Sequence, residues 1–254
     1  MKHNNPLAHT FAPRFGNTAG LTQDDEFSVN VYSKQINVFS IYIDSEIVSP
    51  QDFRGAVQVL SMASENDEVN VYLNSNGGSA DGGMSFLHAA NDCKAEITYH
   101  GSGTIASMAA IILCSAERFT LSPHSSIMLH TASGGAFGTM KNAERYAAFN
   151  RKNMEAFCSF HCAGVLTRDE LRRMYDNNEE FWFTSDEFTS RWQRKQDCKD
   201  ILFDMVECGE LDPQQVKAEV YTEIMLNLTD AHDAEKSAQK PKPKKRVPRV
   251  KKED

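Results

Sequence analysis

The sequence predicts an α/β protein in which helices cover a parallel or mostly parallel sheet. Short runs of β-branched residues alternate along the chain with segments long enough to form helices, and two of these helical segments follow strands that end in glycine. Alternation of this kind is typical of parallel strands joined by helical connections. The predicted strands are residues 38–43, 69–73, 97–99, 118–121 and 127–129.

The first helix has a clear start. Ser49 can cap it, and Pro50 suits its first position because proline needs no hydrogen-bond partner there. Phe53, Val57 and Leu60 then recur at helical spacing, which gives the helix one apolar face. We expect that face to pack on the core.

Two further helices begin at turns. One spans residues 80–93, directly after the Gly77-Gly78 pair. The other begins close to Ser107 and continues through the apolar segment 108–114. Both starts place polar or glycine residues at the end of a strand, where the N–H groups of the next helix converge.

The following part of the chain is predicted to be helical. The segment 132–138 interrupts regular structure, and residues 139–165 then form a long helix that extends beyond a compact core. Thr167 and Thr184 each stand three residues before a glutamate, which is the spacing of a capping box. We expect a helix to start at each threonine, with residues 177–183 connecting the two.

The chain is expected to hold one folded domain with appendages, and order is predicted to begin near Phe27. Both ends carry too little apolar sequence to fold alone. The predicted division is a flexible arm at 1–26, the folded domain at 27–198, a helical extension at 199–239 with helices at 200–208 and 212–228, and a disordered basic tail at 240–254.

Composition excludes several classes of protein. The formal charge of -8 over 254 residues argues against a nucleic-acid binder, although it averages an acidic body with a basic tail. Six cysteines are scattered without a C-x-x-C pair, which favours free thiols in the cytoplasm over a disulfide framework. The longest apolar run, residues 108–114, is too short to cross a bilayer, so no membrane span is expected.

Ser107 is the first candidate for chemistry. It stands at a strand-to-helix junction, where its hydroxyl feels the helix dipole and nearby N–H groups point at developing negative charge. A serine that only caps a helix would stand in the same place. The Gly77-Gly78 pair suits an oxyanion hole because its backbone can approach a ligand closely, but it also suits a simple turn.

A nucleophilic serine needs a base, and three histidines stand near strand ends: His100, His124 and His130. His130 closes the strand 127–129, so its imidazole could emerge beside Ser107. The base in turn needs a carboxylate to orient it. Residue pattern alone does not rank the three histidines.

Cofactor signals are weak. Cys158, His161 and Cys162 lie within about one helical turn with no second ligand pair, so packing is favoured over a metal site and we predict no metal. No ATP-binding loop of the G-x-x-x-x-G-K-S/T type occurs, so any ATP dependence would come from a partner.

Three segments in register resemble the ClpP peptidase family: 71–79 with its Gly-Gly turn, 103–109 with Ala-Ser-Met, and 118–130, which runs from Arg-Phe to Met-Leu-His. The resemblance extends from about residue 27 to 187. It implies a ClpP/crotonase-like fold of repeated β-β-α units with a protruding handle strand and helix. The handle would comprise 134–138 and the helix after it.

The resemblance also implies roles for individual residues. Ser107 would be the nucleophile and His130 the general base, with the backbone N–H groups of Gly78 and Met108 as the oxyanion hole. The family has an aspartate as the third member of its triad, and Glu180 occupies that slot here, with Glu179 or Asp176 as alternatives. Asn76 replaces the family's usual proline, and Thr131-Ala132 replaces Gln-Pro.

The activity implied is that of an ATP-dependent Clp-type serine endopeptidase, the proteolytic subunit. Such a subunit would assemble with itself into stacked heptameric rings and cleave unfolded polypeptides delivered by a AAA+ unfoldase of the ClpX or ClpA type. One alternative is a non-catalytic or assembly-related ring protein, for example a diverged phage copy that acts in capsid maturation. The other is a crotonase-type acyl-CoA enzyme, which would not need the Ser-His pair.

Overall fold

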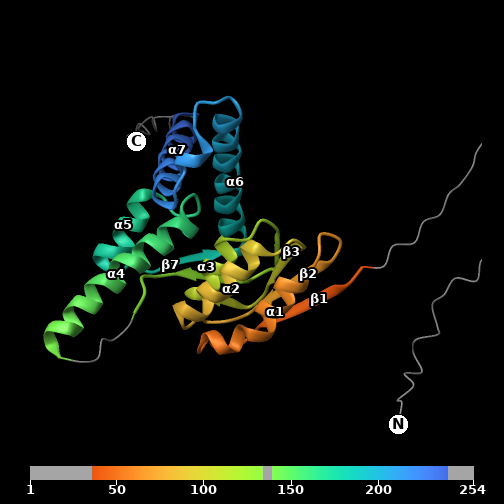
Figure 1. Cartoon of the computed structure of the whole chain (residues 1–254). Coiled ribbons are helices and arrows are strands. Elements are labelled where there is room, and N and C mark those ends of the chain that lie inside the picture. Colours follow the sequence, from red (N-terminus) through yellow and green to blue (C-terminus); the bar gives the residue numbers. More distant parts are fainter. Residues whose placement is uncertain (1–35, 134–138, 240–254) are drawn as a thin grey trace, which may run out of the picture. The chain divides into compact units, whose positions relative to one another are not determined.

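The computed structural model describes residues 36–133 and 139–239, and it confirms the predicted α/β class (Figure 1). Four predictions fall outside the described residues: the flexible arm at 1–26, the start of order near Phe27, the handle strand at 134–138 and the basic tail at 240–254. Within the described part, strands and helices alternate through the first half of the chain, and helices dominate the second half.

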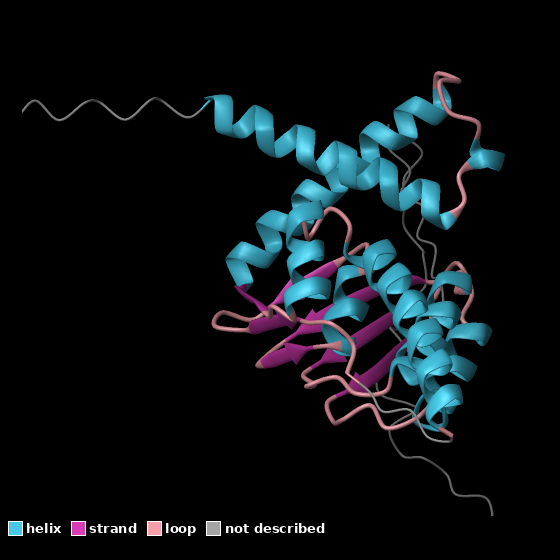
Figure 2. Ribbon diagram, turned by 90° about the vertical axis from the view of Figure 1, so that its left-hand side faces the viewer, coloured by secondary structure: helices cyan, strands magenta, loops and turns pink. Residues whose placement is uncertain are grey.

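The larger sheet has four parallel strands in the order β1-β2-β3-β5. Val71 and Leu73 of β2 are buried, whereas Tyr72 between them is partly exposed, so one face of this sheet packs on the core. Figure 2 shows the strands side by side with helices packed against them. The strands are β1 (Val38–Ile43), β2 (Glu68–Leu73), β3 (Glu96–Gly101) and β5 (Phe119–Leu121).

A second sheet has the order β4-β6-β7, with β4 parallel and β7 antiparallel to the central strand. Its strands are β4 (Thr104–Ala106), β6 (Ser126–Leu129) and β7 (Phe181–Thr184). The prediction that 177–183 is only a connection is wrong at its end, because Phe181 and Phe183 are buried and pair with β6. The sheet matters because β4 leads to Ser107 and β6 leads to His130.

Three helices cover the core of the first half. The predicted helix start is confirmed: Pro50–Phe53 form a short 3₁₀ turn, the Asp52 carboxylate accepts the Ser49 N–H at 2.8 Å, and α1 (Arg54–Met62) follows. Helix α2 spans Ala80–Asp92, and every residue of α3 (Met108–Cys114) is buried. Since α3 is surrounded by core, the turn at its start has little freedom to move.

Both predicted capping boxes are confirmed. After the long helix α4 (Met140–Cys162), Thr167 caps α5 (Arg168–Asn177) by accepting from the N–H of Glu170 at 3.2 Å. Thr184 likewise accepts from the N–H of Glu187 at 3.3 Å. The capping glutamates reach back to the threonine N–H groups, at 2.9 Å in each case.

The predicted bounds of the last helices are wrong. Helix α6 runs unbroken over Ser185–Glu207, and after a 3₁₀ turn at Pro213–Gln215, α7 spans Ala218–Gln239. The predicted domain boundary at Cys198 therefore falls inside a helix. Cys198 is buried against α7, where the Thr229 hydroxyl lies 4.0 Å from its sulfur.

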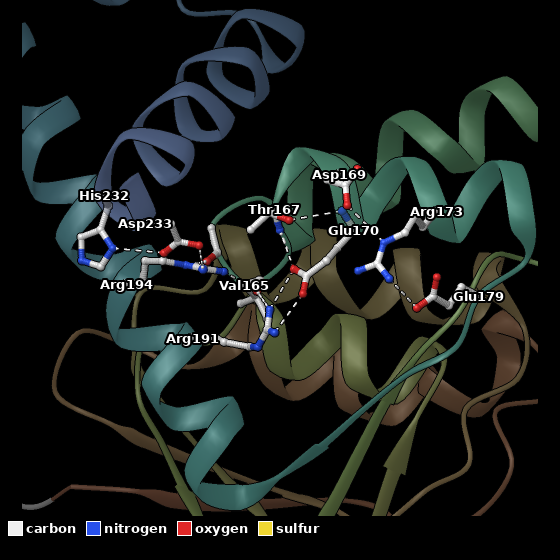
Figure 3. Close-up of polar contacts among 11 residues, drawn as sticks. Val165, Thr167, Asp169, Glu170, Arg173, Glu179, Arg191, Arg194, His232 and Asp233 are labelled. Atoms are coloured by element: carbon white, nitrogen blue, oxygen red, sulfur yellow. Dashed lines mark hydrogen bonds and ion pairs between the residues drawn. The ribbon is translucent and has the colours of Figure 1, made fainter. Parts of the chain in front are cut away.

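Arginine side chains link α6 and α7 to the preceding segment through hydrogen bonds and ion pairs (Figure 3). Arg194 is 8% exposed; it donates to the carbonyl oxygens of Gly164 and Val165, both at 2.8 Å, and to Asp233 at 2.6 Å. Arg168 meets Glu223 of α7 through two bonds, of 2.9 and 3.0 Å. Among the helices of the described residues, none is long and apolar enough to span a membrane.

Candidate active site

Ser107 occupies a strained turn between β4 and α3. Its φ is 55° and its ψ is -124°, a combination that non-glycine residues rarely adopt and that costs about 1–3 kcal/mol. The turn is held on both sides, because the Ser107 N–H donates to the carbonyl of Met128 at 2.8 Å and the N–H of Ile111 donates to the Ser107 carbonyl at 3.1 Å. A serine that merely caps a helix has no need of this conformation.

His130 meets this serine directly. Its Nε2 lies 2.8 Å from the Ser107 Oγ, and both side chains are half-buried. The cause is sheet register: Ala106 of β4 pairs with Met128 of β6, so the residues that follow each strand emerge together. The structure thus brings together two of the predicted site residues, which lie 23 positions apart in sequence.

The other two candidate histidines lie elsewhere. His100 is held on the larger sheet, with its Nε2 2.8 Å from Asn70 and its Nδ1 2.9 Å from Thr120. His124 is an exposed turn residue with a φ of 65°. Geometry therefore ranks the three histidines where the residue pattern did not.

The Gly77-Gly78 turn packs against the serine turn. Both glycines have positive φ, 89° for Gly77 and 136° for Gly78. A Cβ on Gly77 would lie 2.6 Å from the carbonyl oxygen of Ala106 and 2.7 Å from the Met108 nitrogen, so only glycine fits. The close approach brings the backbone of this turn beside Ser107.

Two N–H groups remain for a developing oxyanion. Met108 is the first residue of α3, where helix geometry leaves the N–H without an intrahelical acceptor. Within residues 36–133 and 139–239, the N–H of Gly78 makes no hydrogen bond, whereas the neighbouring Gly77 N–H donates to the Ser75 Oγ at 3.1 Å. Both predicted oxyanion-hole residues line the same cavity as Ser107.

The predicted acid is not bonded to the base. The Glu180 carboxylate accepts the indole N–H of Trp182 at 3.2 Å, and Glu179 pairs with Arg173 at 2.8 Å (Figure 3). Within the described residues, none of the three candidate carboxylates, Asp176, Glu179 and Glu180, makes a hydrogen bond to His130. Asp176 of α5 lines a cavity of about 330 Å³ together with Thr131, the residue after His130.

The cavity over Ser107 measures about 650 Å³. Its lining includes residues 44–48, the Gly77-Gly78 turn, and Met154 and Cys158 of α4. It shares Ala132, Ser133, Met154 and Cys158 with the cavity that Asp176 lines. A volume of this size is typical of cavities that bind small ligands.

Ser75 is a site residue that sequence reasoning missed. Its side chain is 4% exposed; the hydroxyl donates to the carbonyl of Ser45 at 2.5 Å and accepts the Gly77 N–H. Its own carbonyl accepts the N–H of Ala106 at 2.9 Å. Ser75 therefore makes hydrogen bonds to the 44–48 loop, to the Gly77-Gly78 turn and to β4, the strand that leads to Ser107. A serine before Asn-Gly-Gly signals a turn, but its partners 30 residues away are not readable from sequence.

The Cys158-His161-Cys162 group packs in the interior. Burial raises the pKa of the Cys158 thiol and lowers the pKa of His161 to about 4, so both side chains are neutral near pH 7. His161 Nδ1 lies 2.7 Å from the Ser115 Oγ. Among the described residues, no group of three His, Cys, Asp or Glu side chains is placed to hold a metal ion.

The Clp protease family model matches residues 23–188. ATP-dependent Clp protease proteolytic subunit 2 of Corynebacterium glutamicum is 28% identical over 170 residues, which cover 63% of this chain and 82% of that protein. Subunit 2 of Rhodococcus jostii is 26% identical over 177 residues, or 66% and 86% of the two chains. Subunit 1 of Mycobacterium bovis is 26% identical over 181 residues, or 67% and 85%. The family match ends in the first turn of α6, so the rest of α6 and α7 lie beyond it.

Proposed function

The chain belongs to the Clp protease family, and we propose that it is a serine endopeptidase in which Ser107 attacks the peptide carbonyl and His130 acts as general base. The observation that carries the proposal is the 2.8 Å contact between the Ser107 Oγ and the His130 Nε2. The strained φ of Ser107 supports it, because strain of this kind clusters at reactive residues.

In the proposed mechanism, the Ser107 Oγ forms a bond to the substrate carbonyl carbon while His130 takes the hydroxyl proton. The N–H groups of Gly78 and Met108 stabilise the resulting oxyanion, a contribution of about 3 kcal/mol per donor in comparable sites. The carbon–nitrogen bond then breaks, and His130 gives its proton to the leaving amine. A water molecule, deprotonated by His130, releases the acyl group from Ser107.

We propose Asp176 as the acid that orients His130, in place of Glu180. Asp176 lines the cavity that adjoins the Ser107 cavity, whereas the Glu180 carboxylate is engaged by Trp182. Glu180 remains the competing candidate for one structural reason. Leu129 pairs with Phe181, so Glu180 stands one position beyond the last β6–β7 pair, opposite His130.

We further propose that the chain self-associates into rings and receives unfolded polypeptides from a AAA+ unfoldase. The relatives are named as proteolytic subunits of an ATP-dependent protease, and this sequence contains no P-loop of its own. Helix α4 exposes Met140 (82%), Tyr146 (56%) and Phe149 (65%), which supports burial of that helix against other subunits. The mass of the purified protein in solution tests this proposal, because a ring has several times the mass of one chain.

We also propose a cytoplasmic location and a division of the chain at the family boundary. All six cysteines are free, as expected in a reducing compartment. The peptidase domain would end within α6, and the rest of α6 with α7 would form the C-terminal extension.

Hydrolysis of fluorogenic peptides by the purified chain and by Ser107→Ala tests the activity. The proposal expects cleavage that disappears in the variant. Acyl-CoA binding without peptide cleavage would favour the crotonase alternative. Ring formation without either property would favour a non-catalytic assembly protein.

A further inference from the structure

The loop of residues 44–48 is a fixed wall of the Ser107 cavity. The Ile47 N–H donates to the Gly77 carbonyl at 2.8 Å, and the Ser79 N–H donates to the Ile47 carbonyl at 2.6 Å. On the other side of Glu46, the Ser45 carbonyl accepts the buried Ser75 hydroxyl at 2.5 Å. Glu46 is thus held between two anchored residues beside the proposed oxyanion hole.

The charged side chains on this wall are both acidic. Apart from His130, Asp44 and Glu46 are the only ionisable acidic or basic side chains, thiols aside, among the described residues that line the cavity. No lysine or arginine of the described segments lines it. Both carboxylates are exposed, and within the described residues neither is part of an ion pair. Among the described residues that line the cavity, the only formal charges besides any on His130 and the Cys158 thiol are therefore these two negative ones.

We infer that Asp44 and Glu46 select peptide substrates that carry a lysine or arginine side chain within two residues of the scissile bond. The inference rests on the proposed function. An extended peptide advances about 3.3 Å per residue, so the side chains nearest the scissile carbonyl lie within reach of the loop that contacts Gly77. A cationic side chain there gains Coulomb attraction without displacing a protein cation. An acidic side chain in the same place meets repulsion.

The size of the effect follows from the exposure of the two carboxylates. Water and salt weaken exposed charge pairs, so the attraction is modest and depends on ionic strength. We expect kcat/KM to favour arginine over its neutral isostere citrulline by about three- to tenfold at low salt. The preference should fall as salt is added.

The experiment uses one fluorogenic peptide sequence in which a single arginine or citrulline is scanned across the positions flanking the cleaved bond. The full-length chain, Asp44→Asn, Glu46→Gln and the double variant are compared. The double variant should bring the arginine-to-citrulline ratio of kcat/KM close to one. Glu65→Gln is the matched control, because Glu65 is an exposed acid outside the cavity lining, and it should keep the wild-type ratio.

The outcomes separate the two proposals. Ser107-dependent cleavage with the same kcat/KM for arginine and citrulline at every position would overturn the charge preference and leave the peptidase proposal standing. A preference that survives in the double variant would also overturn it. If no peptide in the series were cleaved in a Ser107-dependent manner, the peptidase proposal would fail, and the charge preference with it.

Discussion

Gly77 lies so close to Ser107 that a Cβ on the glycine would sit 2.7 Å from the Cβ of the serine. The positive φ of Gly77 and this contact have one cause, which is the packing of the Gly-Gly turn onto the turn that carries the serine. The proposed oxyanion hole exists only while these two turns touch. Several of the expected effects of mutation depend on that contact.

Gly77→Ala should destabilise the protein and disrupt the site. An alanine at a φ of 89° is strained by about 1–3 kcal/mol, and its Cβ also clashes with the Ala106 carbonyl oxygen. Urea unfolding and the rate of peptide cleavage measure the two effects. Gly55→Ala in α1 is the control: a Cβ at that position would have nothing within 4 Å, and the change should stabilise the helix by about 0.5–1 kcal/mol. Equal stability losses in both variants would contradict the packing account.

Ser75→Ala should lower both stability and kcat. The change leaves the Gly77 N–H and the Ser45 carbonyl without their hydroxyl partner, at a cost of about 2 kcal/mol. Because Gly77 precedes the proposed oxyanion donor Gly78, kcat should fall more than KM rises. Ser61→Ala removes an exposed hydroxyl whose only hydrogen bond among the described residues is within its own helix, so it should change neither quantity. A wild-type kcat for Ser75→Ala would show that the anchoring has no part in catalysis.

Neutral substitution of the three carboxylates identifies the acid of the triad. Asp176→Asn should reduce kcat by more than about 100-fold, since loss of the carboxylate leaves the base in the wrong tautomer. Glu180→Gln should have a much smaller effect on kcat. Glu179→Gln breaks an exposed ion pair with Arg173 and should cost less than about 1 kcal/mol of stability. The reverse ranking of Asp176 and Glu180 would return the role to Glu180.

Lys195 should give the protein a characteristic pH dependence. Its ammonium is buried and donates to the carbonyls of Cys114 at 2.8 Å and His161 at 2.6 Å, at the C-terminal ends of α3 and α4. Burial lowers the pKa of Lys195 from 10.5 to about 8. Between these values the unfolded chain binds more protons than the folded one, so this group makes stability rise with pH.

Lys195→Met isolates that contribution, because tyrosines and cysteines also titrate in the same range. The free energy of unfolding of the wild type minus that of the variant should increase from about pH 8 to about pH 10.5. Urea unfolding at several pH values measures it. A difference that is flat or falls over this range would mean that burial does not lower the pKa of Lys195.

Helices and strands were predictable from the sequence where a capping residue, a proline or a β-branched run marks them. Pro50 and the two Thr-x-x-Glu boxes fixed three helix starts, and β-branched runs marked all four strands of the larger sheet. Strand β7 was missed because Phe181–Thr184 is a strand only through its pairing with β6. The continuity of α6 was missed because Arg194 and Lys195 look like surface residues, although both are buried and bonded to carbonyls of other segments.

The site was predictable to a similar degree. Ser107 and His130 follow strands that pair in parallel, and the resemblance to the ClpP family implied that the two side chains meet. The carboxylate was not predictable in this way, because Asp176, Glu179 and Glu180 stand close together in the sequence and their side chains go to different places. The roles of Ser75 and of the 44–48 loop depend on contacts between segments 30 residues apart, which no local pattern encodes.

Covalent labelling distinguishes an activated nucleophile at position 107 from an ordinary serine. A fluorophosphonate reacts with a serine only when a base and an oxyanion hole activate it. A peptidase that uses Ser107 should give one adduct per chain by intact mass, located on Ser107 by peptide mapping. The adduct should be absent from Ser107→Ala and form much more slowly in His130→Ala. A folded wild-type chain that takes up no label, or a label that persists in Ser107→Ala, would mean that Ser107 is not an activated nucleophile.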